Sequence, residues 1–199
     1  MHMVIEPKTL YFGSAVVLIT TRNETGTANV APMSSAWWLG RSCMLGMSSQ
    51  SQTVQNLMRE KECVLNLPSV DMVPAIERLT LLTGRNPVPE KKAARGYQFE
   101  ADKLGVADLS SLPSEVVQAP RVKECPVQME ARLVKLHPME EPSSLVAMED
   151  GHSNYIDPAK WKPLLMNFCQ YFGLGEQLSD SRLAPVFGPP KRAGQSETC

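Results

Sequence analysis

Residues 15–38 read AVVLITTRNETGTANVAPMSSAWW, and this segment sets the architecture of the chain. The apolar run Ala15–Thr21 predicts a buried strand, because it is short, continuous and rich in β-branched residues. Arg22–Gly26 is typical of a turn, since Asn and Gly tolerate the positive φ that tight turns need. Thr27–Trp38 is then expected to return along the first strand, so that the whole segment predicts a β-hairpin.

Three further elements are predicted directly after this hairpin. Cys43–Ser48 and Glu62–Leu67 have the apolar, β-branched character of strands. Between them, Val54–Glu60 predicts a short helix, because Val54, Leu57 and Met58 recur on one face.

The remainder of the chain contains two more helical patterns. Asp71–Leu82 predicts a helix whose buried stripe consists of Met72, Ile76 and Leu79, and Glu90–Tyr97 predicts a second helix. The mixed aromatic segment Lys160–Leu174 is expected to be partly helical, whereas Gln98–Pro120 is predicted to be irregular.

Extended segments complete the prediction. Cys125–Leu136 alternates apolar and polar residues, which is the period-2 pattern of a half-buried strand with Val127, Met129, Ala131 and Leu133 on one face. Leu145–Met148 is expected to form one more strand. Many short strands with few long helices favour a barrel or sandwich with helical excursions.

Composition excludes several classes of function. The chain has 199 residues, with 20 Lys and Arg against 21 Asp and Glu, and no long block of like charge, which argues against a nucleic-acid partner. The five cysteines include no C-x-x-C pair and the three histidines are isolated, so neither a disulfide framework nor a metal site is expected. The polar N-terminus and short apolar runs predict a cytoplasmic protein with no membrane span.

One polar loop has the residue types of an anion-binding site. Ser48–Thr53 lies between a predicted strand and a predicted helix, and each of its residues carries a hydroxyl or an amide. Unpaired N–H groups at a helix N-terminus, together with hydroxyls, form an anion site, and phosphate is the natural ligand. The competing interpretation is a polar loop in which Ser51 or Thr53 merely caps the helix. Neither G-x-x-x-x-G-K-[ST] nor G-x-G-x-x-G occurs where a phosphate cradle would need it.

An ordered set of motifs over about residues 10–184 resembles the flavin reductase-like family, the FMN-binding split β-barrels. The set contains the strand Ala15–Thr21, the loop Ser48–Thr53 and a series of shorter matches, which are Gly26, Asn29, Pro32, Ser34, Trp37, Asn56, Asn66-Leu67-Pro68, Lys92–Tyr97, Ala119-Pro120, Glu124-Cys125-Pro126 and Tyr171–Gly175. One departure is the connection Glu149–Ser153, which is shorter than the strand and loop that members usually have there. The sequence therefore does not decide whether the barrel closes at that wall.

The resemblance implies a fold, a domain organisation and a cofactor. The fold would be mainly β with α excursions, a Greek-key-like split β-barrel over residues 1–184, followed by a flexible tail at 185–199. The cofactor would be FMN, with its phosphate at Ser49, Ser51 and Thr53 and its ring along the strand Met33–Trp37. The implied cofactor-binding residues are Asn29, Met33, Ser34, Ser35, Ala36, Trp37, Ser48, Ser49, Gln50, Ser51, Thr53, Asn56 and Arg95.

Some of these assignments have structural alternatives. Lys92 or Arg95 would add a cation at the phosphate, but each also fits a solvated helix face. Trp37 and Trp38 are adjacent, so on a strand they face opposite sides, one toward the core and the other toward a ring or a partner subunit. His152 either meets a substrate or is a surface histidine.

The resemblance also implies an activity. NAD(P)H would deliver a hydride to FMN, and the electrons would pass to an unknown small-molecule or protein acceptor, with no dedicated catalytic side chain assigned. The alternatives are a flavin-binding electron carrier without a nicotinamide site, and a barrel that has lost flavin and serves as an interaction module. The family further implies a homodimer in which both subunits wall the flavin site.

Overall fold

The computed structural model describes residues 2–5, 13–137, 145–148, 165–167 and 170–182. The chain divides into two compact units, one formed by residues 14–137 and the other by residues 1–13 with 138–199. The predicted boundary between residues 184 and 185 and the short connection Glu149–Ser153 lie outside the described residues.

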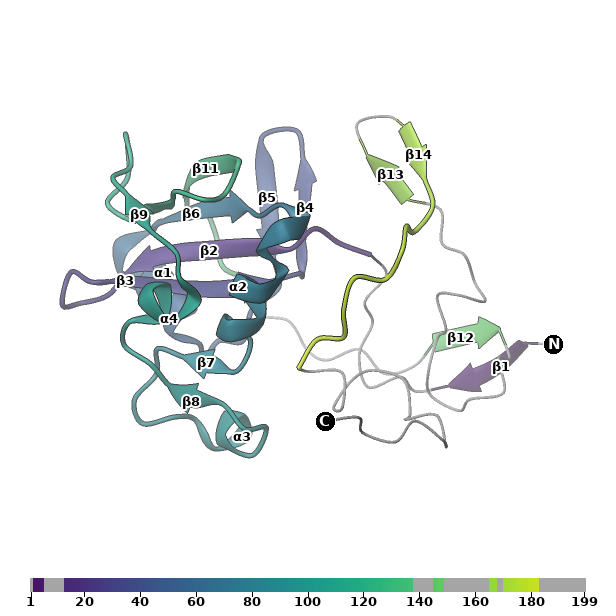
Figure 1. Ribbon diagram of the computed structural model, residues 1–199, viewed down its shortest axis with the longest axis horizontal. Helices are drawn as coiled ribbons and strands as arrows, with labels where there is room; N and C mark the ends of the chain where they lie inside the picture. The colour runs from purple at the N-terminus through teal and green to yellow at the C-terminus, as the bar shows by residue number, and fades with distance from the viewer. Residues whose placement is uncertain (1, 6–12, 138–144, 149–164, 168–169, 183–199) are drawn as a thin grey trace. The chain divides into compact units, whose positions relative to one another are not determined.

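The unit at residues 14–137 is organised around a four-stranded antiparallel sheet with the order β11-β6-β2-β3 (Figure 1). Strand β2 spans Val17–Arg22, β3 spans Ala28–Met33, β6 spans Glu62–Leu67 and β11 spans Val127–Arg132. The hairpin β2–β3 confirms the prediction from residues 15–38, and its turn contains Gly26 at φ +84°. The conformation there suits glycine, since a Cβ would disfavour it.

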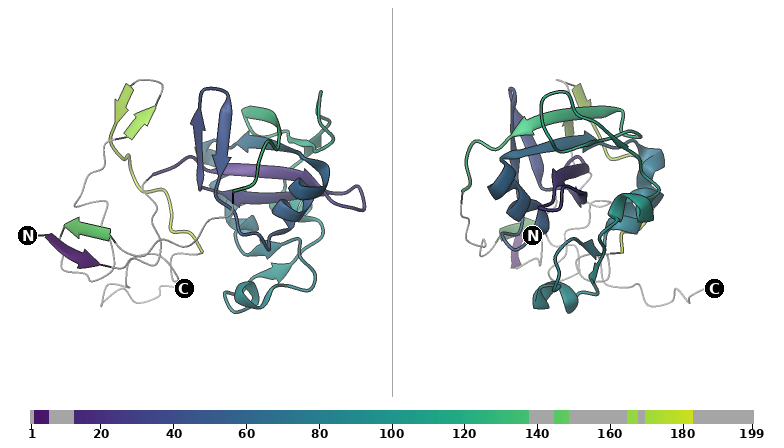
Figure 2. Two further views of the ribbon diagram at one scale, coloured as in Figure 1. Left: turned by 180° about the vertical axis from the view of Figure 1, so that it is seen from behind. Right: turned by 90° about the vertical axis from the view of Figure 1, so that its left-hand side faces the viewer.

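The two faces of the sheet are covered by different elements (Figures 1 and 2). Helix α1 (Gln52–Glu60) and the hairpin of β4 (Ala36–Leu39) with β5 (Ser42–Leu45) cover one face, where Val17, Ile19 and Leu57 are buried. Helices α2 (Val73–Leu79) and α4 (Lys103–Ala107) cover the other face, around Leu18. Alternation along β2 sends Leu18 opposite to its neighbours, and this explains why the strand is apolar throughout.

Short elements complete this unit. They are the 3₁₀ helix η1 (Val70–Met72), β7 (Leu82–Thr83), α3 (Glu90–Ala93), β8 (Gln98–Phe99), β9 (Ser111–Leu112) and β10 (Arg121–Val122). Strand β7 pairs with β8 in parallel, and β9 pairs with β10 antiparallel.

The other unit contains two small antiparallel pairs. Strand β1 (His2–Ile5) pairs with β12 (Leu145–Met148), which confirms the predicted strand there. Strand β13 (Leu165–Asn167) pairs with β14 (Gln170–Phe172). The expectation that Lys160–Leu174 is partly helical was wrong for these described residues, because an apolar and aromatic run of this kind suits a hairpin.

Three other predictions need correction. The helix expected at Glu90–Tyr97 ends at Ala93, and Gly96 follows with φ +82°. The segment Gln98–Pro120 is not wholly irregular, because it contains α4, which is too short to show a helical period. Val127 was placed on the inward face of its strand, but it is exposed at the strand's first position.

Candidate functional site

The polar loop at residues 48–51 turns directly into helix α1. The N–H of Ser51 donates to the Ser48 carbonyl at 3.0 Å, and the Ser51 hydroxyl accepts from the N–H of Val54 at 3.2 Å. The Gln55 side chain donates to the Ser49 carbonyl at 3.0 Å, so the helix also holds the loop. Ser48, Ser49 and Gln50 are exposed. Ser51 is therefore the N-cap of α1, and the residues before it face solvent.

The first turn of α1 retains free donors. The N–H groups of Gln52 and Thr53 form no hydrogen bond with the part of the chain that the structure describes. Unpaired N–H groups at this position carry the partial positive charge of the helix. Together with the exposed hydroxyls of Ser48 and Ser49, they form a surface that suits an anion.

Behind this turn lies a buried network of amides and hydroxyls. The Asn29 amide donates to Thr21 Oγ1 and to Thr53 Oγ1, at 3.2 Å each. The Asn56 amide donates to Thr21 Oγ1 at 3.0 Å and to Asn23 Oδ1 at 2.9 Å. The structure thus brings together the predicted residues Asn29, Thr53 and Asn56, and it uses their side chains to fix α1 against β2 and β3. Sequence reasoning missed Thr21, which accepts from both asparagines.

The predicted ring-binding residues lie where β3 passes into β4. The Ser34 carbonyl accepts from the Ser14 hydroxyl, and the Ser35 carbonyl accepts from the N–H of Gly46 at 2.7 Å. Ala36 belongs to the buried cluster on the α1 face, and the partly buried Met33 packs against that cluster. These contacts hold the link between β3 and β4 in place beside the sheet.

The two tryptophans face opposite sides, as predicted. Trp37 is 57% exposed, whereas Trp38 packs against the buried cluster on the α1 face. Because Trp37 lies on the strand predicted to carry the ring, its free face is available to a ligand or to another subunit.

Basic residues gather around helices α3 and α4. Lys92 Nζ lies 5.1 Å from the centre of the Tyr97 ring, and burial lowers the pKa of Lys92. Arg95 lies in the exposed turn after α3. Lys103 is only 4% exposed, and burial together with the charge of Lys92 lowers its pKa to about 7. No sequence pattern singled out Lys103, because its burial depends on the packing of α4.

The thiols of the three cysteines that the structure describes are not poised for nucleophilic chemistry. Burial raises the pKa of Cys63 and of Cys125 to about 12, and it also raises the pKa of Cys43. A thiol that stays protonated at neutral pH is a poor nucleophile and a poor metal ligand. The three behave as buried or half-buried free cysteines.

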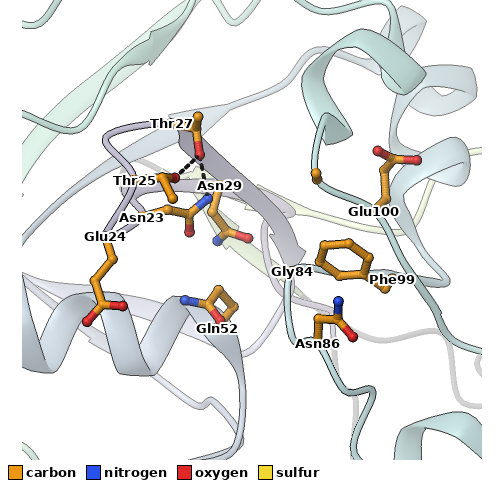
Figure 3. A pocket seen from close by; sticks show the side chains of 11 residues that line it. Asn23, Glu24, Thr25, Thr27, Asn29, Gln52, Gly84, Asn86, Phe99 and Glu100 are labelled. Atoms are coloured by element: carbon orange, nitrogen blue, oxygen red, sulfur yellow. Dashed lines mark hydrogen bonds between the residues drawn. The ribbon is translucent and has the colours of Figure 1, made fainter.

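A pocket of about 320 Å³ lies beside Asn29 (Figure 3). It is lined by the β2–β3 turn, the first residue of α1, and the segments that contain Gly84 and Phe99. Of the residues predicted to bind the cofactor, Asn29 is the only one that lines this pocket. No sequence pattern grouped Gly84 or Phe99 with Asn29, since each of them lies more than fifty positions after it.

No helix within the described ranges has the length and apolar character needed to cross a bilayer.

Comparison with known proteins places this fold. Residues 9–175 match the family model described as flavin reductase like domain. A Bacillus subtilis protein, YdfE, which is described as uncharacterized, is 38% identical over 186 residues, covering 87% of this chain and 90% of its own.

Two solved structures share the fold at low identity. Flavoredoxin of Desulfovibrio vulgaris has a TM-score of 0.55 and 19% identity, covering 87% of this chain and 93% of its own. A Shewanella frigidimarina protein whose description names a split barrel domain has a TM-score of 0.51 and 16% identity, covering 84% of each chain. The predicted fold class, mainly β with helical excursions in a split barrel, is confirmed. From the match over residues 9–175, the chain belongs to the flavin reductase-like domain family.

Proposed function

We propose that this protein binds FMN and transfers a hydride from NAD(P)H to it, with the electrons passing on to a separate acceptor. Membership of the flavin reductase-like family supports a flavin-related oxidoreductase. The observation that carries the proposal is the N-terminus of α1, where exposed hydroxyls precede two free backbone donors. That arrangement offers an anion several hydrogen bonds without requiring a lysine.

The phosphate would lie against the outer side of this turn. Ser48 and Ser49 are exposed, and the hydroxyl of Ser51 accepts from Val54 while its own proton stays available. The N–H groups of Gln52 and Thr53 complete the set. The Thr53 side chain is buried against Asn29, so Thr53 contributes through its backbone and positions the turn through its hydroxyl. Arg95 would supply a cation at the same anion.

The flavin ring would lie along the link from Met33 to Trp37, as the family resemblance implies. The cofactor supplies the redox chemistry, and the chain supplies binding and orientation. The exposed face of Trp37 gives this site an apolar wall. FMN is preferred to FAD in this proposal because the phosphate itself is what the turn would hold.

Flavin binding is tested by titrating the purified full chain with FMN and following its absorption and fluorescence. The variant Ser48→Ala with Ser49→Ala removes two exposed hydroxyls, and we expect affinity for FMN to fall by about thirtyfold, since each of the two charge-assisted bonds contributes on the order of 1 kcal/mol. The matched control is Ser111→Ala, an exposed serine on β9. An unchanged affinity in the double variant would remove the assigned loop from the proposal.

Hydride transfer is tested separately by stopped-flow mixing with NADH and with NADPH. We expect rapid bleaching of the bound flavin by at least one of them. Bleaching that occurs only with a reduced partner protein would instead favour the alternative, a flavin-binding electron carrier without its own nicotinamide site. The family resemblance carries both candidates, and the absence of bound FMN in the titration would exclude both.

We also propose that the protein is a cytoplasmic homodimer. The β4–β5 hairpin exposes three large apolar side chains, Trp37, Leu39 and Met44. Apolar side chains grouped in this way suit an interface, and a second copy there would cover the ring-binding strand. Sedimentation of the wild type and of Leu39→Ser tests this, with a dimer expected for the first and a shift toward monomer for the second.

A further inference from the structure

Gly46 lies between the two parts of the proposed flavin site. It directly follows β5 and stands two positions before Ser48, the first residue of the polar loop that precedes α1. Its N–H donates to the carbonyl of Ser35 at 2.7 Å, and Ser35 belongs to the link from Met33 to Trp37. One residue therefore connects the segment proposed to hold the ring with the segment proposed to hold the phosphate.

The contact between Gly46 and Ser35 leaves no room for a side chain at position 46. A Cβ there would lie 2.9 Å from the Cβ of Ser35, whereas carbon atoms in contact are about 3.5–4.0 Å apart. Because a Cβ is fixed to its backbone, rotation of the Ser35 side chain does not relieve this contact. Gly46 has no positive φ, so its own backbone conformation would accept a side chain. A larger residue would instead separate the two segments by roughly 0.6 Å or more.

A second residue holds the same link. The hydroxyl of Ser14 donates to the carbonyl of Ser34. Ser14 is exposed and lies just before β2. Two consecutive carbonyls of the link are therefore each held by a different segment of the chain.

The spacing of these segments matters to a flavin nucleotide. Its ring and its phosphate are joined by a single ribityl chain, so both ends bind together only where the ring-binding link and the phosphate turn are correctly spaced. Correct spacing that exists before binding raises affinity without any new contact. A displacement of about 1 Å can slow a reaction on the order of 100-fold.

We propose that Gly46 and Ser14 are positioning residues of the flavin site. Gly46 sets the spacing between the ring-binding link and the phosphate turn, and Ser14 fixes the link itself. Both act through backbone carbonyls, Gly46 on Ser35 and Ser14 on Ser34. Both roles rest on the proposed function, because they require the ring and the phosphate to lie at these two segments.

The test compares FMN with riboflavin, which has the same ring and ribityl chain without the phosphate. Each is titrated into the purified full chain, and the visible absorption of the bound flavin is recorded at saturation, since it reports the surroundings of the ring. In Gly46→Ala both segments keep their binding groups but their spacing changes. We expect affinity for FMN to fall about tenfold and affinity for riboflavin at most about threefold, so the preference for FMN decreases.

Ser14→Ala changes the ring side alone. We expect it to weaken both flavins about threefold, to shift the absorption of each, and to leave the preference for FMN unchanged. Because Ser14 is exposed, the loss of its hydroxyl leaves no buried group unpaired. This variant therefore tests the link even if Gly46→Ala does not fold.

A rescue and a control isolate the contact. Ser35→Gly removes the atom that the new Cβ would meet, so Ser35→Gly combined with Gly46→Ala should recover most of the lost preference for FMN. Gly105→Ala on α4 places a Cβ against the side chain of Asp102, which is a clash of the same kind outside the flavin site. It should change neither the two affinities nor the absorption of the bound flavins.

Each result decides one role. An unchanged preference for FMN in Gly46→Ala, or an equal decrease in Gly105→Ala, would overturn the role of Gly46, and unchanged affinities in Ser14→Ala would overturn that of Ser14. If Gly46→Ala does not fold, failure of the double variant to fold as well would show that Ser35 is not what requires the glycine. In all these cases a wild-type protein that binds FMN leaves the proposed function standing, whereas a wild type that binds neither flavin overturns both.

Discussion

Two buried asparagines, one in the middle of the sheet and one at its edge, are treated differently by the fold. Asn66 on β6 donates to the Leu18 carbonyl at 2.9 Å and accepts from the N–H of Val122 at 2.8 Å, with further contacts to Thr20. Asn29 on β3 is buried to the same degree, but its carbonyl oxygen has no partner among the described residues. The two side chains are thus equally buried, but only the Asn66 amide has hydrogen-bond partners for both its oxygen and its nitrogen.

This difference separates an amide whose hydrogen bonds are complete from one whose acceptor is left unpaired. A satisfied buried amide connects strands and would lose those bonds if a ligand displaced them. A buried acceptor without a donor instead costs the fold free energy, because it has lost its bonds to water and gained none in return. The amide at the centre of the sheet is therefore expected to contribute more to stability than the amide at its edge.

The largest effect is expected at the centre. Asn66→Ala removes the acceptor of the Val122 N–H and the donor to Leu18, and we expect the free energy of unfolding to fall by about 3 kcal/mol. Urea unfolding followed by circular dichroism measures it. Gln118→Ala, at an exposed position, is the control and should change little. A loss of less than about 1 kcal/mol for Asn66→Ala would show that the bonds of this amide are not what holds the strands.

Lys103 is a second kind of buried polar group without a partner, and its effect on stability is expected to depend on pH. Lys103 forms no hydrogen bond or ion pair with the described residues, and its pKa is lowered to about 7 by burial and by the charge of Lys92. In the unfolded chain a lysine titrates at about 10.4, so above pH 7 the unfolded state holds a proton that the folded state lacks. Stability should therefore rise with pH from about 7.

Two buried thiols set the pH above which stability stops rising. Cys63 and Cys125 have folded pKa values of about 12, whereas an unfolded thiol ionises at about 8.5, so they remove stability as the pH rises above that value. We expect a positive slope of up to about 1.4 kcal/mol per pH unit between about pH 7 and 8.5. In Lys103→Met this slope should be much smaller. An equal slope in both proteins would mean that Lys103 does not titrate there.

The sequence predicted the centre of the molecule better than its edge. The bounds of β6, Glu62–Leu67, were predicted correctly, because a continuous apolar run reports burial on both faces of a sheet. The hairpin of β2 with β3 followed from its turn residues. These features are local, and local patterns are what a single sequence displays.

The site was predicted only in part, because much of it depends on contacts that are not local in the sequence. The hydroxyl and amide residues that precede α1 could be recognised as a group, and the structure confirms that Ser51 caps the helix. The pairing of Asn29 with Thr53, and the approach of Gly84 to Asn29, depend on tertiary contacts between distant segments. The assignment of these residues to a cofactor stays a prediction.

The smallest effect on stability is expected at the edge, and it gives the sharpest test of the comparison. Asn29→Ala and Asn66→Ala make the same chemical change at equally buried positions, so their cavity terms are similar. Asn29→Ala loses two bonds of 3.2 Å but also removes an acceptor that had no donor, and we expect a loss of about 1 kcal/mol. Urea unfolding of both variants at one pH measures the difference, which should be about 2 kcal/mol. Equal losses would show that the Asn29 carbonyl is satisfied in solution, and the contrast between the two amides would fall with it.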